Sequence, residues 1–306
     1  MGHPSDGILL VDKAGGETSF DVIRRIRHIL PGRKIGHAGT LDPLATGLLI
    51  ILLGQGTKLC QWIMLHEKVY EGVLKLGVET DTLDSTGKIT AEYPVPSLTL
   101  EELASAGRQL TGKIEQKPPR FSAVKVAGQR AYRLARKGTA FDLPKRQVFV
   151  RSLKILSMDL PQVTIRVRCS AGTYVRSLFA DLGRKVGTGA HMTALRRKAS
   201  GQFFVENAIT SESLCRELNA AVLEGEVIPL SRALPDMMEL KVNGVLARKI
   251  RQGYRPAGEE LLSGDRRWNG VSEHVKITKD EELIAVARIY DAKTKGMTTR
   301  LLRVFH

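Results

Sequence analysis

The chain of 306 residues has few cysteines, few aromatic side chains and no long apolar run. Its three cysteines, Cys60, Cys169 and Cys215, are widely separated, which argues against a disulfide framework or a zinc site. No apolar stretch approaches the roughly 20 residues that a membrane-spanning helix needs, and the N-terminus lacks the pattern of a secretory signal. We therefore expect a protein of the reducing cytoplasm without membrane association.

Charge is the strongest feature of the composition. The chain has 47 Lys and Arg against 32 Asp and Glu, a formal net charge of +15, which favours a polyphosphate partner such as a nucleic acid. An aromatic content of 5% argues against an extended surface for stacking single-stranded bases. A DNA-binding regulator would fit the charge, but no helix-turn-helix or zinc-finger pattern is present.

The stretch 33–54 combines a glycine-containing loop, expected to be held at the edge of a core, with a strongly apolar segment. The run Leu48–Leu53 is uninterruptedly apolar, as expected for a strand that is buried on both faces. Gly36 and Gly39 allow the preceding loop to turn sharply or to approach a ligand. Asp42 stands in this loop as an isolated carboxylate between leucines, which suits a functional acid. Because Asp-Pro also commonly starts a helix, local spacing leaves a capping role open.

Residues 117–146 form a nearly uniform basic segment that begins at a pair of prolines. Phe121 and Tyr132 are interspersed among the cations, and Asp142 is the one carboxylate opposing the basic residues that follow the prolines. Both a solvated helix face and a surface that grips an RNA backbone fit this composition. The basic residues are Arg120, Lys125, Arg130, Arg133, Arg136, Lys137, Lys145 and Arg146.

Several motifs resemble those of the TruB family, the pseudouridine synthases that modify uridine-55 in the T loop of tRNA. The stretch GHAGTLDPLATGLL is similar to the family signature, and DGILLVDKAGGETS is similar to its opening motif, with Ala14 in the place of the usual proline. The resemblance implies that Asp42 is the catalytic aspartate. It also implies that His37 assists in bringing the target nucleotide into the pocket.

Further motifs extend this resemblance along the chain. KVYEG implies that Tyr70 stacks on the flipped base, as extruded bases require. CSAGTYVRSLFADLG implies that Tyr174 packs on the base and that Arg176 pairs with the catalytic aspartate, keeping it ionised. GAHMTALRR implies that Leu195 forms a wall of the pocket, whereas we interpret His191 as structural. The segment 79–87 is expected to be a turn rather than a calcium loop or a source of catalytic groups.

The resemblance also covers the basic segment and the end of the chain. PPRFSAVKVAGQRAYRLARKG is similar to the insertion that closes over the T stem-loop in this family, with Phe121 in the usual tyrosine position. We expect Lys13 and three arginines of this insertion, Arg130, Arg133 and Arg136, to contact the RNA backbone. These three are called the insertion arginines below.

The implied fold is α+β, with a mixed, largely antiparallel sheet flanked by helices. Residues 1–232 are expected to form the catalytic domain, including the basic insertion at about 117–146. Residues 233–306 occupy the place of a small, all-β, PUA-like RNA-binding domain. Its expected strands lie at 275–277, 283–289 and 301–305, with turns at Gly253 and Gly264.

The implied reaction is isomerisation of uridine to pseudouridine by base flipping, which needs no metal and no cofactor. The expected partner is the T stem-loop of tRNA, with no obligate protein partner and a monomeric state. A non-catalytic RNA-binding or RNA-folding protein is an alternative, against which the joint presence of Asp42, Tyr70 and Arg176 argues. A catalytic subunit of a guide-RNA-dependent particle is another, and the well-developed basic insertion favours stand-alone tRNA recognition instead.

Overall fold

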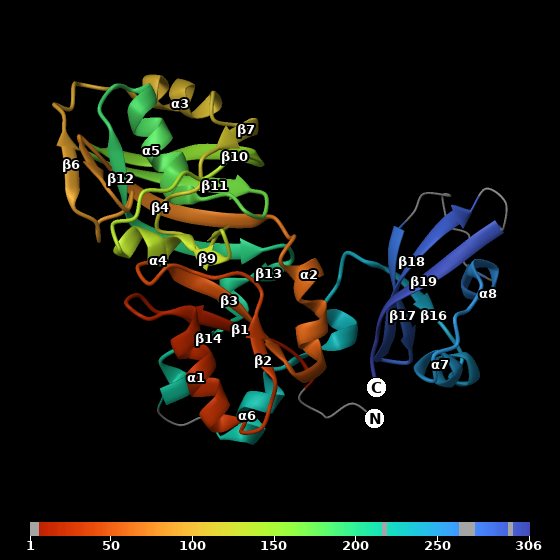
Figure 1. Cartoon of the computed structure of the whole chain (residues 1–306). Coiled ribbons are helices and arrows are strands. Elements are labelled where there is room, and N and C mark those ends of the chain that lie inside the picture. Colours follow the sequence, from red (N-terminus) through yellow and green to blue (C-terminus); the bar gives the residue numbers. More distant parts are fainter. Residues whose placement is uncertain (1–5, 216–218, 263–272, 293–295) are drawn as a thin grey trace.

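The computed structural model describes residues 6–215, 219–262, 273–292 and 296–306. A large sheet with helices makes up the main body, and a smaller unit built around a second sheet lies beside it (Figure 1). None of the helices in the described part of the chain has the length and apolar character needed to cross a bilayer.

The large sheet contains eleven strands and is mixed but mostly antiparallel, as predicted. The pairs β12–β3 and β1–β14 are parallel, and the other pairs in this sheet are antiparallel. Three short strands lie off the main order: β2 (Ile35–His37), β13 (Phe203–Phe204) and β15 (Ile228–Pro229). The main order is β14 (Ile209–Thr210), β1 (Gly7–Lys13), β3 (Thr46–Leu53), β12 (Ala190–Ser200), β4 (Lys68–Leu76), β11 (Gln162–Cys169), β10 (Arg146–Asp159) and β7 (Gly112–Gln116).

Strand β3 is central because both of its faces are buried, which confirms the prediction from its apolar run. Leu49, Ile51 and Leu53 belong to one core cluster. Leu48, Ile50 and Leu52 belong to a second cluster on the opposite face. Successive side chains of a strand point to opposite faces, so a continuous apolar run serves two cores at once. The loop that carries Asp42 is thereby attached to the most buried strand of the body.

Capping boxes define the N-termini of two helices of the body. In α1 (Ser19–Ile29) the cap is Thr18, whose hydroxyl accepts from the backbone of Asp21. In α3 (Leu100–Arg108) Thr99 and Glu102 form the box, as the Thr-x-x-Glu spacing of the sequence favours. The other helical segments are α5 (Val175–Lys185), α2 (Cys60–Ile63), α6 (Ala220–Gly225), and the 3₁₀ turns η1 (Gly54–Leu59), η2 (Val205–Asn207), η3 (Ser213–Cys215) and η4 (Leu230–Arg232).

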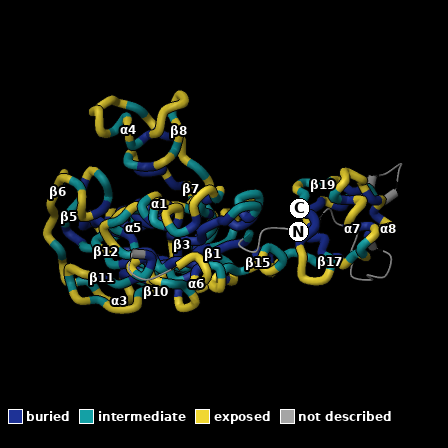
Figure 2. The backbone as a smooth tube through the Cα atoms, turned by 90° about the horizontal axis from the view of Figure 1, so that it is seen from below, coloured by how far each residue is buried: buried dark blue, intermediate teal, exposed yellow. Residues whose placement is uncertain are grey.

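The basic insertion projects from the body. It consists of a hairpin of β8 (Lys125–Val126) and β9 (Gln129–Arg130), followed by the short helix α4 (Ala131–Arg136). Figure 2 shows β8 and α4 standing clear of the sheet, with much of this lobe exposed. A second small hairpin, β5 (Val78–Thr80) with β6 (Ile89–Glu92), flanks the segment 81–88.

The smaller unit holds a four-stranded sheet with its own core cluster. It is not purely β, because residues 244–251, expected within the all-β region, form a helix capped by Asn243. The expected turn at Gly264 lies outside the described residues. The unit consists of β16 (Met238–Lys241), α7 (Gly244–Arg251), α8 (Gly258–Leu262), β17 (Glu273–Lys279), β18 (Glu282–Ala292) and β19 (Gly296–Val304).

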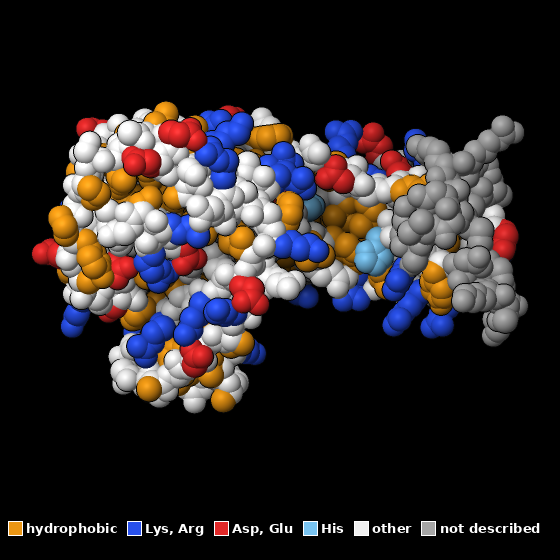
Figure 3. All heavy atoms as spheres, turned by 90° about the horizontal axis from the view of Figure 1, so that it is seen from above, with side chains coloured by type: hydrophobic (Ala, Val, Ile, Leu, Met, Phe, Trp, Pro, Cys, Tyr) orange, Lys and Arg blue, Asp and Glu red, His pale blue; other side chains and the backbone are white. Residues whose placement is uncertain are grey.

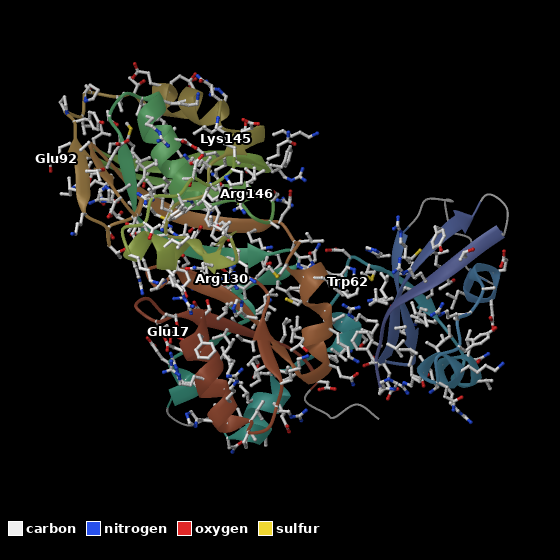
Figure 4. The ribbon with its side chains drawn as sticks, in the orientation of Figure 1. Glu17, Trp62, Glu92, Arg130, Lys145 and Arg146 are labelled. Atoms are coloured by element: carbon white, nitrogen blue, oxygen red, sulfur yellow. The ribbon has the colours of Figure 1, made fainter. Side chains whose placement is uncertain are left out.

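A narrow junction, called the neck, joins the main body to the smaller unit beside α2 (Figure 1). Trp62 of α2 faces the smaller unit (Figure 4) and contacts the His274 ring edge-on at 6.2 Å. Phe305 shares a core cluster with Leu59 and Ile63. The last strand is therefore packed directly against the segment that follows β3.

Candidate active site

A cavity of about 370 Å³ opens between the sheet and the base of the insertion. Its walls come from segments that are far apart in the sequence and that the sheet order brings together. Arg146, at the start of β10, lies at this cavity, and Arg130 projects from the insertion nearby (Figure 4). Five of the six residues predicted to be catalytic or to contact the base line it: Asp42, Tyr70, Tyr174, Arg176 and Leu195.

Asp42 sits in a tight turn, not at a helix start. The backbone of Ala45 donates to the carbonyl of Asp42 at 3.0 Å, and no helix follows. The capping interpretation of Asp42-Pro43 is therefore wrong. Two contacts fix the turn: the backbone N–H of Leu41 donates to the Ser19 hydroxyl at 3.0 Å, and Arg197 donates to the carbonyl of Gly39 at 3.0 Å.

Arg176 is the hub of the cavity. Its Nε lies 3.0 Å from Oδ2 of Asp42, so the predicted pair is present. Its side chain is 5% exposed, whereas that of Asp42 is 38% exposed. The carboxylate thus reaches open space while the guanidinium is held behind it. Nη1 of Arg176 donates to the carbonyl of Thr82, and Nη2 donates to the carbonyl of Phe121, each at 2.9 Å. Because guanidinium is planar and always charged, these contacts fix its orientation.

A second carboxylate, Asp84, contacts the same guanidinium at 3.1 Å and is buried. Its Oδ1 also accepts hydrogen bonds from the Thr82 hydroxyl at 2.7 Å and from the backbone of Thr86 at 3.0 Å. The segment 79–87, which holds Asp84, is mostly a turn, as predicted, but its contact with the site was not predicted. Asp84 and Arg176 are 92 positions apart, so no local spacing could reveal the pair.

Burial raises the pKa of Asp42 above its ordinary value. The charges of Arg176 and Lys13 lower this pKa, and the charge of Asp84 raises it, so that the net direction is upward. The expectation that Arg176 simply keeps the carboxylate ionised is thus incomplete. Desolvation and a nearby like charge oppose the guanidinium.

Neighbouring residues hold the two aromatic walls of the cavity, Tyr70 and Tyr174, in place. Tyr70 on β4 pairs in register with Val167 of β11 and Arg197 of β12. Tyr174 caps α5, and its backbone exchanges two hydrogen bonds with the side chain of Gln116, at 2.7 and 3.0 Å. The guanidinium of Arg146 lies 4.4 Å from the centre of the Tyr174 ring. Leu195 adds an apolar wall.

Arg197 also lines the cavity, although no role was predicted for it. It is buried and donates to the carbonyls of Leu48 at 2.6 Å and Gly39 at 3.0 Å. Burial lowers the pKa of Arg197, and the neighbouring Tyr70 raises it. Arg197 thus connects the loop that carries Asp42 to strand β3, next to its strand partner Tyr70.

His37 and Lys13 lie outside the cavity lining, as do the insertion arginines. His37 is on β2, opposite Ile51, and its buried Nδ1 has no hydrogen-bond partner among the described residues. Burial, followed by the charge of Arg197, lowers the pKa of His37. Lys13 is fully buried, and its ammonium donates to the carbonyls of Ala14 and Glu17 at 2.7 and 2.8 Å. The prediction that Lys13 contacts RNA is therefore wrong, because the side chain is used inside the protein.

His191 is structural, as interpreted. It is buried, and its Nδ1 lies 2.9 Å from the carbonyl of Val78. Within the described ranges, no group of three or more His, Cys, Asp or Glu side chains is arranged to hold a metal ion.

Two residues of the cavity lining each carry a buried polar atom without a hydrogen-bond partner. Among the described residues, the buried Ser122 Oγ and Arg146 Nε have no hydrogen-bond partner, and both residues line the cavity. Figure 3 shows Lys and Arg side chains along the hollow between the body and the projecting insertion, with a few carboxylates among them. In the insertion, the guanidinium carbons of Arg133 and Arg136 lie 5.9 and 5.8 Å from the centre of the Tyr132 ring.

Comparisons with known proteins identify the family of the chain. Residues 27–175 match the family model described as TruB family pseudouridylate synthase (N terminal domain). Residues 176–235 match the model described as tRNA pseudouridylate synthase B C-terminal domain. Proteins named tRNA pseudouridine synthase B are similar along nearly their whole length. The Syntrophus aciditrophicus protein is 41% identical, covering 98% of this chain and 99% of the relative, and the Geobacter sulfurreducens protein is 38% identical, covering 98% and 100%.

Solved structures share the fold. A Cbf5-Nop10-Gar1 complex contains a chain that superposes with a TM-score of 0.74 at 24% identity, covering 99% of this chain and 86% of that one. An H/ACA RNP bound to a substrate RNA gives 0.74 at 22% identity, with the same coverage. On the sequence matches, the chain belongs to the TruB family of pseudouridylate synthases.

Proposed function

We propose that this protein isomerises uridine to pseudouridine in tRNA, at uridine-55 of the T loop. The observation that carries the proposal is the Asp42–Arg176 pair at 3.0 Å in a cavity walled by Tyr70 and Tyr174. An extruded base needs a stacking surface and a pocket isolated from bulk water. The relatives named tRNA pseudouridine synthase B support the choice of tRNA as substrate.

The proposed reaction conserves all heavy atoms of the nucleotide. The N1–C1′ bond breaks, the uracil rotates while it is held, and C5 bonds to C1′. The hydrogen on C5 leaves as a proton, and N1 is protonated. Asp42 is the partly exposed anion beside the reacting centre, and Arg176 holds it in place from the buried side. Tyr70 and Tyr174 hold the base as it turns.

RNA binding is assigned to the insertion and the C-terminal unit. The insertion arginines form no ion pair with a described carboxylate; Arg130, for example, donates to the carbonyl of Ala123. Such cations remain available to phosphates. We propose that residues 1–232 are the catalytic domain, with the insertion at about 117–146, and that residues 233–306 are a PUA-like RNA-binding domain. Because the insertion supplies its own cations, we infer a monomer that needs no obligate protein partner. The few cysteines and the likeness to tRNA-modifying relatives support a cytoplasmic location.

The test uses a tRNA transcript tritiated at C5 of uracil. Forming the C5–C1′ bond releases that tritium, so the native protein is expected to release one equivalent per tRNA. Asp42→Asn is expected to release none above background while binding tRNA normally. Asp159→Asn, at the far end of β10, is the matched control and should behave as native. Equal release by native protein and Asp42→Asn would remove Asp42 from catalysis.

A further inference from the structure

A second, strongly basic cavity of about 270 Å³ lies at the neck between the body and the smaller unit. Half of its lining residues are cationic, and they come from three separate segments. Lys34 precedes β2, Lys58 is in η1, and Arg303 is in β19. The remaining lining residues are polar or small: Thr57, Cys60 and Gln61.

The nearest counter-charge, Asp6, acts on Lys58 from outside the cavity lining. No carboxylate lines the cavity, and none of the three cations forms an ion pair within the described residues. Several exposed arginines of the body, by contrast, are paired with carboxylates. Arg151 and Arg168 both contact Glu67, at 2.7 and 2.9 Å, and Arg166 contacts Glu71 at 2.6 Å. Cations that gather in a cavity with no carboxylate in its lining favour an anionic ligand there.

Lys58 is held in position for such a ligand. Its ammonium donates to Oε1 of Gln55 at 3.0 Å and to the carbonyl of Val304 at 2.7 Å. An ammonium has three N–H donors, so one remains for the cavity. Burial lowers the pKa of Lys58, and the charges of Lys34 and Arg303 lower it further, although Asp6 raises it. Asp6 itself is engaged by Gln55 at 3.0 Å. A bound anion would relieve the repulsion among the cations.

We propose that this cavity binds a phosphate group in the backbone of the RNA substrate. The proposal rests on the proposed function, because it makes the cavity a second anchor for the same tRNA. Lys34 and Arg303 are exposed, as contact with a polymer requires. The short helix α2 joins the two cavities: Cys60 and Gln61 line the basic one, and Met64 and Leu65 line the catalytic one. The proposal therefore has one RNA molecule contact both ends of the segment 60–65.

The test is a Lys34→Ala/Arg303→Ala double variant, which spares Lys58 because that residue also holds strand β19. We expect tRNA binding to weaken about fivefold to tenfold at low salt. The slope of log affinity against log salt should fall by about one, as for the loss of one phosphate contact. The control double variant Lys154→Ala/Arg248→Ala removes the same charge from exposed positions that line no cavity. It should change affinity less than twofold.

Three outcomes overturn the proposal. In the first, the two double variants weaken binding equally, which would show a net-charge effect. In the second, tRNA binding and its salt slope are unchanged in the site variant. In the third, inorganic phosphate raises the melting temperature of the native protein but not of the variant while tRNA binding is equal, which would assign the cavity to free phosphate.

A failure of the proposed function gives a different result. Native protein that binds tRNA through this site but releases no tritium would contradict the isomerase proposal and leave the phosphate site standing. Tritium release at saturating tRNA should be unchanged in the site variant, because neither residue lines the catalytic cavity.

Discussion

Replacing Arg176 with methionine tests the hub of the catalytic cavity. The guanidinium contacts Asp42 and Asp84 and donates to the carbonyls of Thr82 and Phe121. Methionine fills much of the same space but donates no hydrogen bond. The side chain of Asp84 is 6% exposed, so it would become a buried carboxylate without a counter-ion. Breaking such a pair costs about 3–5 kcal/mol of unfolding free energy.

A second substitution separates the charge effect from lost packing. In the Arg176→Met/Asp84→Asn double variant no buried charge is left unpaired, so we expect about 1–3 kcal/mol of the loss to be recovered. The assay is urea unfolding of the native protein, both single variants and the double variant. Arg166→Met is the matched control, because its pair with Glu71 has side chains that are 52% and 30% exposed. It should cost less than about 1 kcal/mol.

The same variant has a predictable effect on the pH dependence. Arg176 lowers the pKa of Asp42, so its removal raises that pKa further. Activity that needs ionised Asp42 is lost as pH falls through the pKa of the folded protein. The acid limb of the single-turnover rate should therefore move to higher pH in Arg176→Met. A double variant no more stable than Arg176→Met, together with an unmoved acid limb, would refute the hub argument.

Three other predictions concern separate parts of the molecule. Asp84→Asn alone removes a charge that raises the pKa of Asp42, so the acid limb should move to lower pH, as rate measurements across pH would show. Gly47→Ala should destabilise by more than about 3 kcal/mol, because its φ is +96° and the new Cβ would lie 2.4 Å from the Arg197 carbonyl oxygen. Gly187→Ala, with φ +77° and open space, should cost only about 1–2 kcal/mol in the same unfolding assay. Charge reversal of the insertion arginines should weaken tRNA binding and flatten its salt dependence, and an unchanged slope would exclude phosphate contacts there.

The sequence predicts those parts of the fold that depend on local chemistry. The Thr99–Glu102 capping box lies where the pattern places it, and the apolar run 48–53 is a strand with two buried faces. The helix α7 in the smaller unit was missed, although Asn243 is a good N-cap. Its position in a region of short apolar runs favoured strands, since helix and strand are hard to separate in short segments.

The site was predictable only where motifs carried it. Family motifs located Asp42 and Arg176, and the structure brings them to 3.0 Å. Asp84 was missed because its partner lies 92 positions away and its turn chemistry already explained its presence. Lys13 was expected to contact RNA, but its side chain is buried. Its burial depends on backbone carbonyls of the loop around it, which no residue pattern reveals.

The contacts of Arg176 link the insertion to the carboxylate of Asp42. One of its amino groups donates to the carbonyl of Phe121, which belongs to the insertion. The next residue of α5, Ser177, donates to the carbonyl of Lys117 at the start of the same insertion. Ser122 and Ala123 then form part of the cavity wall. An RNA that displaces the insertion must therefore change the hydrogen bonding of the guanidinium that orients Asp42. If the insertion binds RNA as proposed, movement of the insertion and the position of the Asp42 carboxylate are coupled through this one guanidinium.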